Sequence, residues 1–142
     1  MTARRGPIVL DTDVFSADLS DTALIALYEP IIVGRPAFVS FQTVAELRYG
    51  AFRRGWGEAR LRKLDAKIAS VEVVHSGDEL VATYARLRTE CVRVGHALGQ
   101  REHDADRWIA ATALRLGIPL VSNDRVFEGT PGLQLESAHP SS

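Results

Sequence analysis

The chain has 142 residues, of which 46% are hydrophobic and 25% charged, and its formal net charge is −1. A chain of this size can bury a core without covalent staples, and the single cysteine, Cys91, excludes a disulfide framework. The first apolar run is short and broken by Asp11, which excludes a signal peptide or a membrane span at this point. We therefore expect a cytoplasmic protein.

The first half of the chain alternates short apolar runs with helical patterns. The runs are partly β-branched and bounded by Gly or Pro, which is typical of buried strands. We expect strands at residues 7–11, 36–40 and 71–75. We expect helices at residues 16–28, 43–54 and 58–69, with Pro30 close to the end of the first.

The second half continues the alternation. A long helix is expected from residue 78 to 94, a loop at 96–103, and a helix from Asp104, as its cap, to Leu116. Strands are expected at residues 118–122 and 133–137, with a short helical turn between them. The pattern predicts one α/β domain over 1–142, with a mostly parallel sheet of about five strands covered on both faces and a frayed tail at 137–142.

Four acidic residues stand where a strand ends or a helix begins. Asp11 and Asp124 follow apolar runs, whereas Glu46 and Asp106 stand near expected helix starts. Ligands of open α/β sheets bind outside the carboxyl ends of the strands. Four carboxylates gathered there would repel one another unless a cation lay among them, so the sequence predicts a metal site.

Three of the four acids also have a local structural interpretation. Glu46 completes a capping box that starts at Thr43, Asp106 suits the positive end of a helix dipole, and Asp124 can close an Asx turn. Asp11 has no such explanation, because an unpaired carboxylate at the end of a buried strand is costly. The joint placement of all four favours the site over four separate coincidences.

The ligand type predicts the metal. Carboxylate oxygens suit Mg²⁺ or Mn²⁺, and the four histidines lack the spacing of a zinc motif. Such an ion activates water and stabilises the charge of an in-line phosphoryl displacement. We therefore expect phosphodiester hydrolysis.

Basic residues are concentrated in one segment. Residues 48–67 hold seven Arg or Lys against two acids, and 15 of the 17 basic residues of the chain are Arg. On charge alone a solvated helix face is the simpler interpretation. Beside an acidic site, the same segment is a candidate surface for the backbone of a nucleic acid.

Several stretches of the sequence resemble the PIN-domain ribonucleases, in particular the VapC toxins of bacterial toxin–antitoxin pairs. They are VLDTDVFS, VSFQTVAELRYGA, DRWIAATALRLGIPLVSNDRVF and EGTPGLQL, in the order and spacing of that family. The resemblance implies a PIN-like three-layer α/β/α fold. It makes Asp11, Glu46, Asp106 and Asp124 the four acidic site residues, with Asp11 and Asp106 as the principal metal ligands.

The resemblance also directs attention to neighbouring positions. Thr12 and Ser40 stand where the family commonly has a hydroxyl near the site. Two positions depart from the family pattern, since Asp13 adds a carboxylate and Val126 replaces a frequent Asp. Asp124 consequently carries the fourth acidic position alone.

The activity implied by the resemblance is that of a Mg²⁺- or Mn²⁺-dependent endoribonuclease that cuts structured cellular RNA. Members of the family usually work as homodimers and are inhibited by a cognate antitoxin protein. The resemblance further implies that operator DNA is bound only through the antitoxin complex.

Two other functions remain compatible with the residues. A haloacid-dehalogenase-like phosphatase would use Asp11 as nucleophile and Asp13 as acid–base, but it needs a lysine at the phosphate, and only Lys63 and Lys67 exist. A non-catalytic RNA- or partner-binding module would keep the acids for structure alone. Release of phosphate from a monoester distinguishes the first alternative from cleavage of internal RNA bonds.

Overall fold

A five-stranded sheet organises the protein, and the computed structural model describes residues 6–140. Its order is β3-β2-β1-β4-β5, and each neighbouring pair is parallel. The expected, mostly parallel sheet of about five strands is confirmed, with β5 at one edge. The strands are β1 (Ile8–Leu10), β2 (Ala37–Ser40), β3 (Glu72–Val74), β4 (Leu120–Val121) and β5 (Leu135–Glu136).

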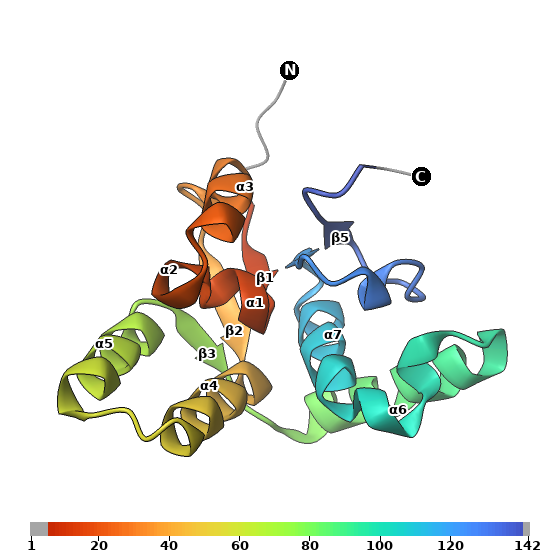
Figure 1. The fold of residues 1–142 in the computed structure, drawn as a ribbon. Coiled ribbons are helices and arrows are strands. Elements are labelled where there is room, and N and C mark those ends of the chain that lie inside the picture. Colours follow the sequence, from red (N-terminus) through yellow and green to blue (C-terminus); the bar gives the residue numbers. More distant parts are fainter. Residues whose placement is uncertain (1–5, 141–142) are drawn as a thin grey trace.

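Helices connect the strands and cover the sheet on both faces (Figure 1). None of them, within residues 6–140, has the length and apolar character needed to span a bilayer. The helices are α1 (Thr12–Phe15), α2 (Ala17–Ser20), α3 (Thr22–Ile32), α4 (Phe41–Arg53), α5 (Glu58–Ala69), α6 (Asp78–Val94) and α7 (Asp104–Leu116). Three 3₁₀ turns, η1 (Ala97–Gly99), η2 (Arg101–His103) and η3 (Arg125–Phe127), complete the described elements.

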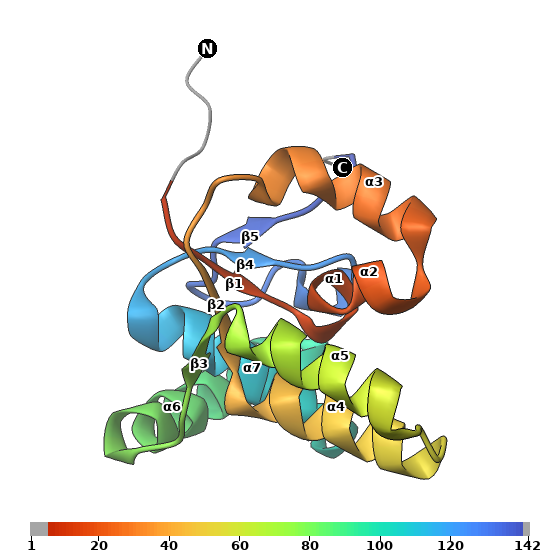
Figure 2. The same cartoon turned by 90° about the vertical axis from the view of Figure 1, so that its left-hand side faces the viewer.

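The strands bury side chains on both sides because successive residues point to opposite faces of a sheet. Val9 packs in a core with α6 and α7, whereas its neighbours Ile8 and Leu10 pack in a second core with α1 and α3. Figure 2 shows α3 on one side of the sheet and α6 with α7 on the other. This arrangement is the expected three-layer architecture.

The first expected helix is wrong at both ends. Helical structure already begins at Thr12, because Asp11 caps α1, and Asp21 starts a new helix by accepting a bond from the amide of Leu24. Pro30 lies inside α3, which runs two residues beyond it. A proline at this position removes the hydrogen bond to the carbonyl of Ala26 and crowds that carbonyl, which is why the sequence favours an earlier helix end.

The segment at 96–103 contains the turns η1 and η2 where a loop was expected. The side chain of Arg107 is buried and donates to the carbonyls of Leu98 and Gln100, at 2.7 and 2.5 Å. Asp104 does not cap α7 as expected, since its carboxylate accepts bonds from Arg107 and Tyr84 instead. The pattern of apolar residues contains no signal for this anchoring, because it depends on a buried arginine.

The start of the expected frayed tail is ordered by hydrogen bonds. The Tyr28 hydroxyl accepts from the amide of Ala138 at 3.1 Å, and the His139 ring bonds the carbonyl of Asn123 at 2.6 Å. These bonds hold Ala138 and His139 against the body of the domain, and the fraying of the tail stays a prediction. Residues 141–142 lie outside the described part of the chain.

A buried ion pair joins the loop before β2 to the edge strand β5. The Arg35 guanidinium donates two parallel bonds to the Glu136 carboxylate, at 2.9 and 3.0 Å, and both side chains are less than a tenth exposed. Arg35 also donates to the carbonyls of Gly6 and Ile31. These bonds satisfy donors that would otherwise be costly to bury.

Glu136→Gln is expected to lower the free energy of unfolding by about 3–5 kcal/mol, because it leaves the buried Arg35 charge without its counterion. The matched control is Glu58→Gln, which breaks an exposed pair with Arg62 and is expected to cost less than about 1 kcal/mol. Urea unfolding of both variants measures the difference. Equal losses would contradict a structural role for the buried pair.

Candidate active site

Asp11 is held rigidly where β1 ends. Its side chain is 6% exposed, and its Oδ1 accepts from the amide of Thr12 at 2.8 Å. Its Oδ2 accepts from the hydroxyl of Ser122 at 2.6 Å. Ser122 follows β4, the neighbouring strand, so the sheet itself brings this donor to the carboxylate. The sequence predictions do not include Ser122, although a hydroxyl directly after an apolar strand is a signal for such a donor.

The surroundings of Asp11 disfavour its charge. Burial, together with the nearby charges of Asp13 and Asp106, raises the pKa of Asp11 to about 8, against the lowering effect of the two hydrogen bonds. Asp106 comes from α7, nearly a hundred residues further along the chain. The fold therefore places these carboxylates in one field of like charge.

Asp13 and Asp124 extend the acidic group. Burial raises the pKa of Asp13, and the charge of Asp124 raises it too, against hydrogen bonds that include one from the amide of Val14. Asp124 accepts from the amide of Val126 at 2.9 Å, so the expected Asx turn is present. Asp13, which the sequence marked only as a departure from the family pattern, is thus a close neighbour of both Asp11 and Asp124.

Asp106 has a partner of its own in the first turn of α7. Its Oδ2 lies 3.1 Å from Nδ1 of His103, and both side chains are less than a third exposed. His103 stands at the end of η2, so the turns anchored by Arg107 also position a partner for Asp106.

Glu46 lies on another helix, α4. Ser40 caps α4 by accepting from the amide of Gln42 at 3.1 Å, so the predicted capping box at Thr43 is wrong. Thr43 is buried, and its hydroxyl lies 3.0 Å from the hydroxyl of Thr12. Glu46 lies one turn further along α4 and lines a cavity of about 240 Å³ together with Thr12. Glu46 is therefore beside the residue that follows Asp11.

The carboxylates do not form a ready-made metal cage. Among residues 6–140, no three Asp, Glu, His or Cys side chains converge closely enough to hold an ion. Several of the acids are instead turned to local donors, such as Gln42 for Glu46 and His103 for Asp106. The donor set nevertheless suits a hard divalent cation, because it consists of carboxylate oxygens. A cation would also relieve the repulsion that raises the pKa of Asp11.

Comparison with known proteins places the chain in a family. The PIN domain family matches residues 8–133. Ribonuclease VapC5 of Mycobacterium tuberculosis is 32% identical over 126 residues, which are 87% of each chain.

Solved structures have the same fold. VapBC2 of Rickettsia felis, bound to a promoter DNA fragment, matches with a TM-score of 0.76 and 25% identity, over 92% of this chain and 98% of that one. DNA-bound VapBC of Salmonella typhimurium matches with a TM-score of 0.76 and 26% identity, over 94% of this chain and 98% of that one. VapBC-5 of Mycobacterium tuberculosis matches with a TM-score of 0.64 and 28% identity, over 92% of this chain and 98% of that one. The chain belongs to the PIN-domain family, and within it to the VapC group.

Proposed function

We propose that this protein is a divalent-metal-dependent endoribonuclease and the toxin of a toxin–antitoxin pair. The observation that carries the proposal is the buried Asp11, held by Ser122 within a field of other carboxylates at the carboxyl ends of parallel strands. The similarity to Ribonuclease VapC5 supports RNA as the substrate. Structured cellular RNA is the substrate class we propose.

Asp11 and Asp106 are the residues proposed to hold Mg²⁺ or Mn²⁺, with Glu46 and Asp124 completing the acidic site. The bound ion would supply an activated water and neutralise charge on the scissile phosphodiester. Ser122 and the amide of Thr12 fix the orientation of the Asp11 carboxylate, and His103 does so for Asp106. Asp13 adds negative charge beside Asp11, which strengthens the attraction for a cation.

A protein partner is part of the proposal. The VapBC structures named above are toxin–antitoxin complexes, and two of them contain DNA. We propose that an antitoxin inhibits this chain and supplies the contacts with operator DNA, and that the toxin is a homodimer. Two exposed aromatic side chains on α4 support a covered surface, because Tyr49 is 67% and Phe52 70% exposed.

The phosphatase alternative needs a lysine beside Asp11 and Asp13, and neither lysine of the chain is held there. Lys67 lies on α5 and its ammonium group pairs with Asp18 at 3.0 Å, while Lys63 lines a cavity between α2 and α5. Neither lysine forms an ion pair or a hydrogen bond with Asp11 or Asp13. A phosphatase reaction would need such a cation at the phosphate.

Asp11→Asn and Asp106→Asn are each expected to lower RNA cleavage more than about 100-fold, because losing a metal ligand should exceed the 10–100-fold cost of losing a group that only orients one. Cleavage of a labelled RNA in Mg²⁺ or Mn²⁺ measures the loss, and EDTA should abolish the wild-type activity. Asp78→Asn, at an exposed helix start, is the control and should cut normally. Cleavage by both site variants at the wild-type rate would refute the site assignment.

Mg²⁺ is expected to stabilise the metal-free protein, since an ion among the carboxylates binds only the folded state. At a Mg²⁺ concentration 100 times the dissociation constant, the free energy of unfolding rises by about 2.7 kcal/mol. For a chain of this size this is a rise of roughly 5–10 °C in melting temperature. Differential scanning calorimetry measures it. Asp78→Asn should respond as the wild type does, and an undiminished rise in Asp11→Asn would argue against binding at Asp11.

Expression of the wild-type chain without a partner is expected to arrest bacterial growth, because uncontrolled RNA cleavage stops protein synthesis. Asp106→Asn, produced at the same level, should leave growth normal. Growth curves with immunoblots of both proteins make the comparison. Arrest by both proteins would disconnect toxicity from the acidic site.

A further inference from the structure

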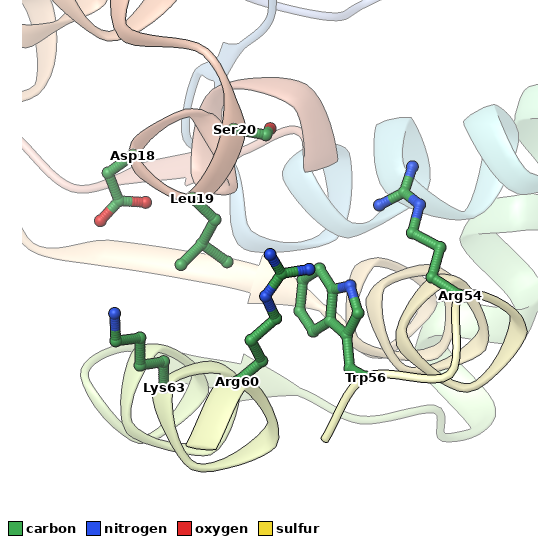
Figure 3. Close-up of a pocket in the computed structure, with 7 residues that line it drawn as sticks. All are labelled: Asp18, Leu19, Ser20, Arg54, Trp56, Arg60 and Lys63. Carbon is green, nitrogen blue, oxygen red and sulfur yellow. The ribbon is translucent and has the colours of Figure 1, made fainter. Parts of the chain in front are cut away.

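A second cavity lies beside the acidic site, between α2 and the pair formed by α4 and α5. Its volume is about 480 Å³, within the range of small-molecule sites. Figure 3 shows Trp56 between Arg54 and Arg60, with residues of α2 facing them. The lining residues are Asp18, Leu19, Ser20, Arg54, Trp56, Arg60 and Lys63.

This cavity adjoins the smaller one that Thr12 and Glu46 line. Leu19, Ser20, Arg54 and Trp56 line both cavities. The two cavities therefore lie side by side, from the residue after Asp11 to the residues that follow α4. An RNA whose phosphodiester lay at the acidic site could place its next nucleotide in the larger cavity.

The cations that line the cavity make no ion pair with an acidic residue in the described part of the chain. In the same segment Arg48 pairs with Asp65, Arg62 with Glu58, and Lys67 with Asp18. The three that line the cavity differ, since within residues 6–140 they make no ion pair. They are Arg54, Arg60 and Lys63.

The charge of the cavity is consequently positive. The one carboxylate in the lining, Asp18, is already neutralised by Lys67 at 3.0 Å. The unpaired guanidinium and ammonium groups suit the phosphates of a nucleic acid, which release counterions when they bind. An acidic site alone would repel the same phosphates.

Trp56 offers an aromatic surface in a fixed place. Gly55 has a left-handed φ of 65°, and the amide of Trp56 bonds the carbonyl of Ala51 at 3.1 Å, which together close the end of α4. The Arg60 guanidinium lies 5.7 Å from the centre of the Trp56 ring. Indole rings with nearby arginines are a recurring platform for unpaired bases.

We propose that this cavity binds one unpaired nucleotide of the substrate RNA, next to the cleaved phosphodiester. The base stacks on Trp56, and the flanking phosphates contact Arg54 and Arg60, with Lys63 at the outer end. The inference rests on the proposed ribonuclease function, since it names a binding subsite for the same substrate. It gives a physical role to basic residues that the charge count alone left as a solvated surface.

The test measures binding of a short single-stranded oligoribonucleotide by fluorescence anisotropy. The protein carries Asp11→Asn and is kept in EDTA, so that the RNA stays intact. Trp56→Ala is expected to weaken binding about 5- to 100-fold, and Trp56→Tyr to recover most of it. Arg54→Gln and Arg60→Gln should each reduce the slope of log affinity against log salt by about 0.7.

Arg53→Gln is the matched control. Arg53 stands next to Arg54 on α4, is exposed and makes no ion pair within residues 6–140, but it does not line the cavity. It should change affinity less than about 2-fold, within the usual range for an exposed substitution. Far-ultraviolet circular dichroism of each variant verifies folding, and the exposed Arg54→Gln and Arg60→Gln variants provide the test if Trp56→Ala does not fold.

An RNA with one abasic nucleotide isolates the stacking contact. A series of RNAs carries the abasic nucleotide at successive positions. At one position it should weaken binding to the protein that retains Trp56 and leave binding to Trp56→Ala unchanged. Equal losses for both proteins at every position would overturn the proposal. The proposal would also be overturned if Trp56→Ala bound RNA as tightly as Arg53→Gln does. If Trp56→Ala then failed to bind a protein partner, the cavity would be the binding site of that partner.

The failure of the subsite and the failure of the ribonuclease proposal give different results. If wild-type protein cuts RNA but the Trp56 and arginine variants bind like the control, only the subsite is wrong. If wild-type protein neither cuts nor binds RNA, the ribonuclease proposal fails and takes the subsite with it.

Discussion

The burial of one carboxylate, that of Asp11, is the constraint on which the acidic site depends. An acid at the end of a central strand is costly unless donors satisfy it, and here a hydroxyl from the next strand and an amide from the following helix do so. These bonds do not offset the burial, and the pKa remains raised by desolvation and by neighbouring carboxylates. The protein therefore keeps a carboxyl group at a place that disfavours its charged form, which is typical of a functional site rather than of a stabilising one.

The parallel sheet explains why distant acids meet. Since β1 and β4 are neighbours and parallel, the residues that follow them, Asp11 and Ser122, emerge at the same edge. Helix α7 packs on β1 from the other core and brings Asp106 to that edge. The ion pair of Arg35 and Glu136 joins the loop before β2 to the edge strand β5.

The charges of the protein are separated in a way that the net value of −1 conceals. Acids gather at the strand ends, while cations that make no ion pair within residues 6–140 gather in the cavity between α2 and α5. Each group alone would be a poor site for RNA, because one repels phosphate and the other has no group for the chemistry. Placed side by side, they complement the two parts of a nucleic acid that such an enzyme must handle, the cleaved phosphate and its neighbours.

The sequence by itself determined the order of strands and helices, and with it the parallel sheet, because apolar runs and helical periodicity are local signals. It also marked Asp11, whose position had no local explanation. It misplaced the caps at Thr43 and Asp104 and the helix around Pro30, since whether a hydroxyl or carboxylate caps a helix depends on competing partners elsewhere. Only the tertiary structure could pair Ser122 with Asp11 and bring residues of α2 to the cavity that Trp56 and the arginines line. Those contacts join residues through the packing of the chain, which no periodicity in the sequence records.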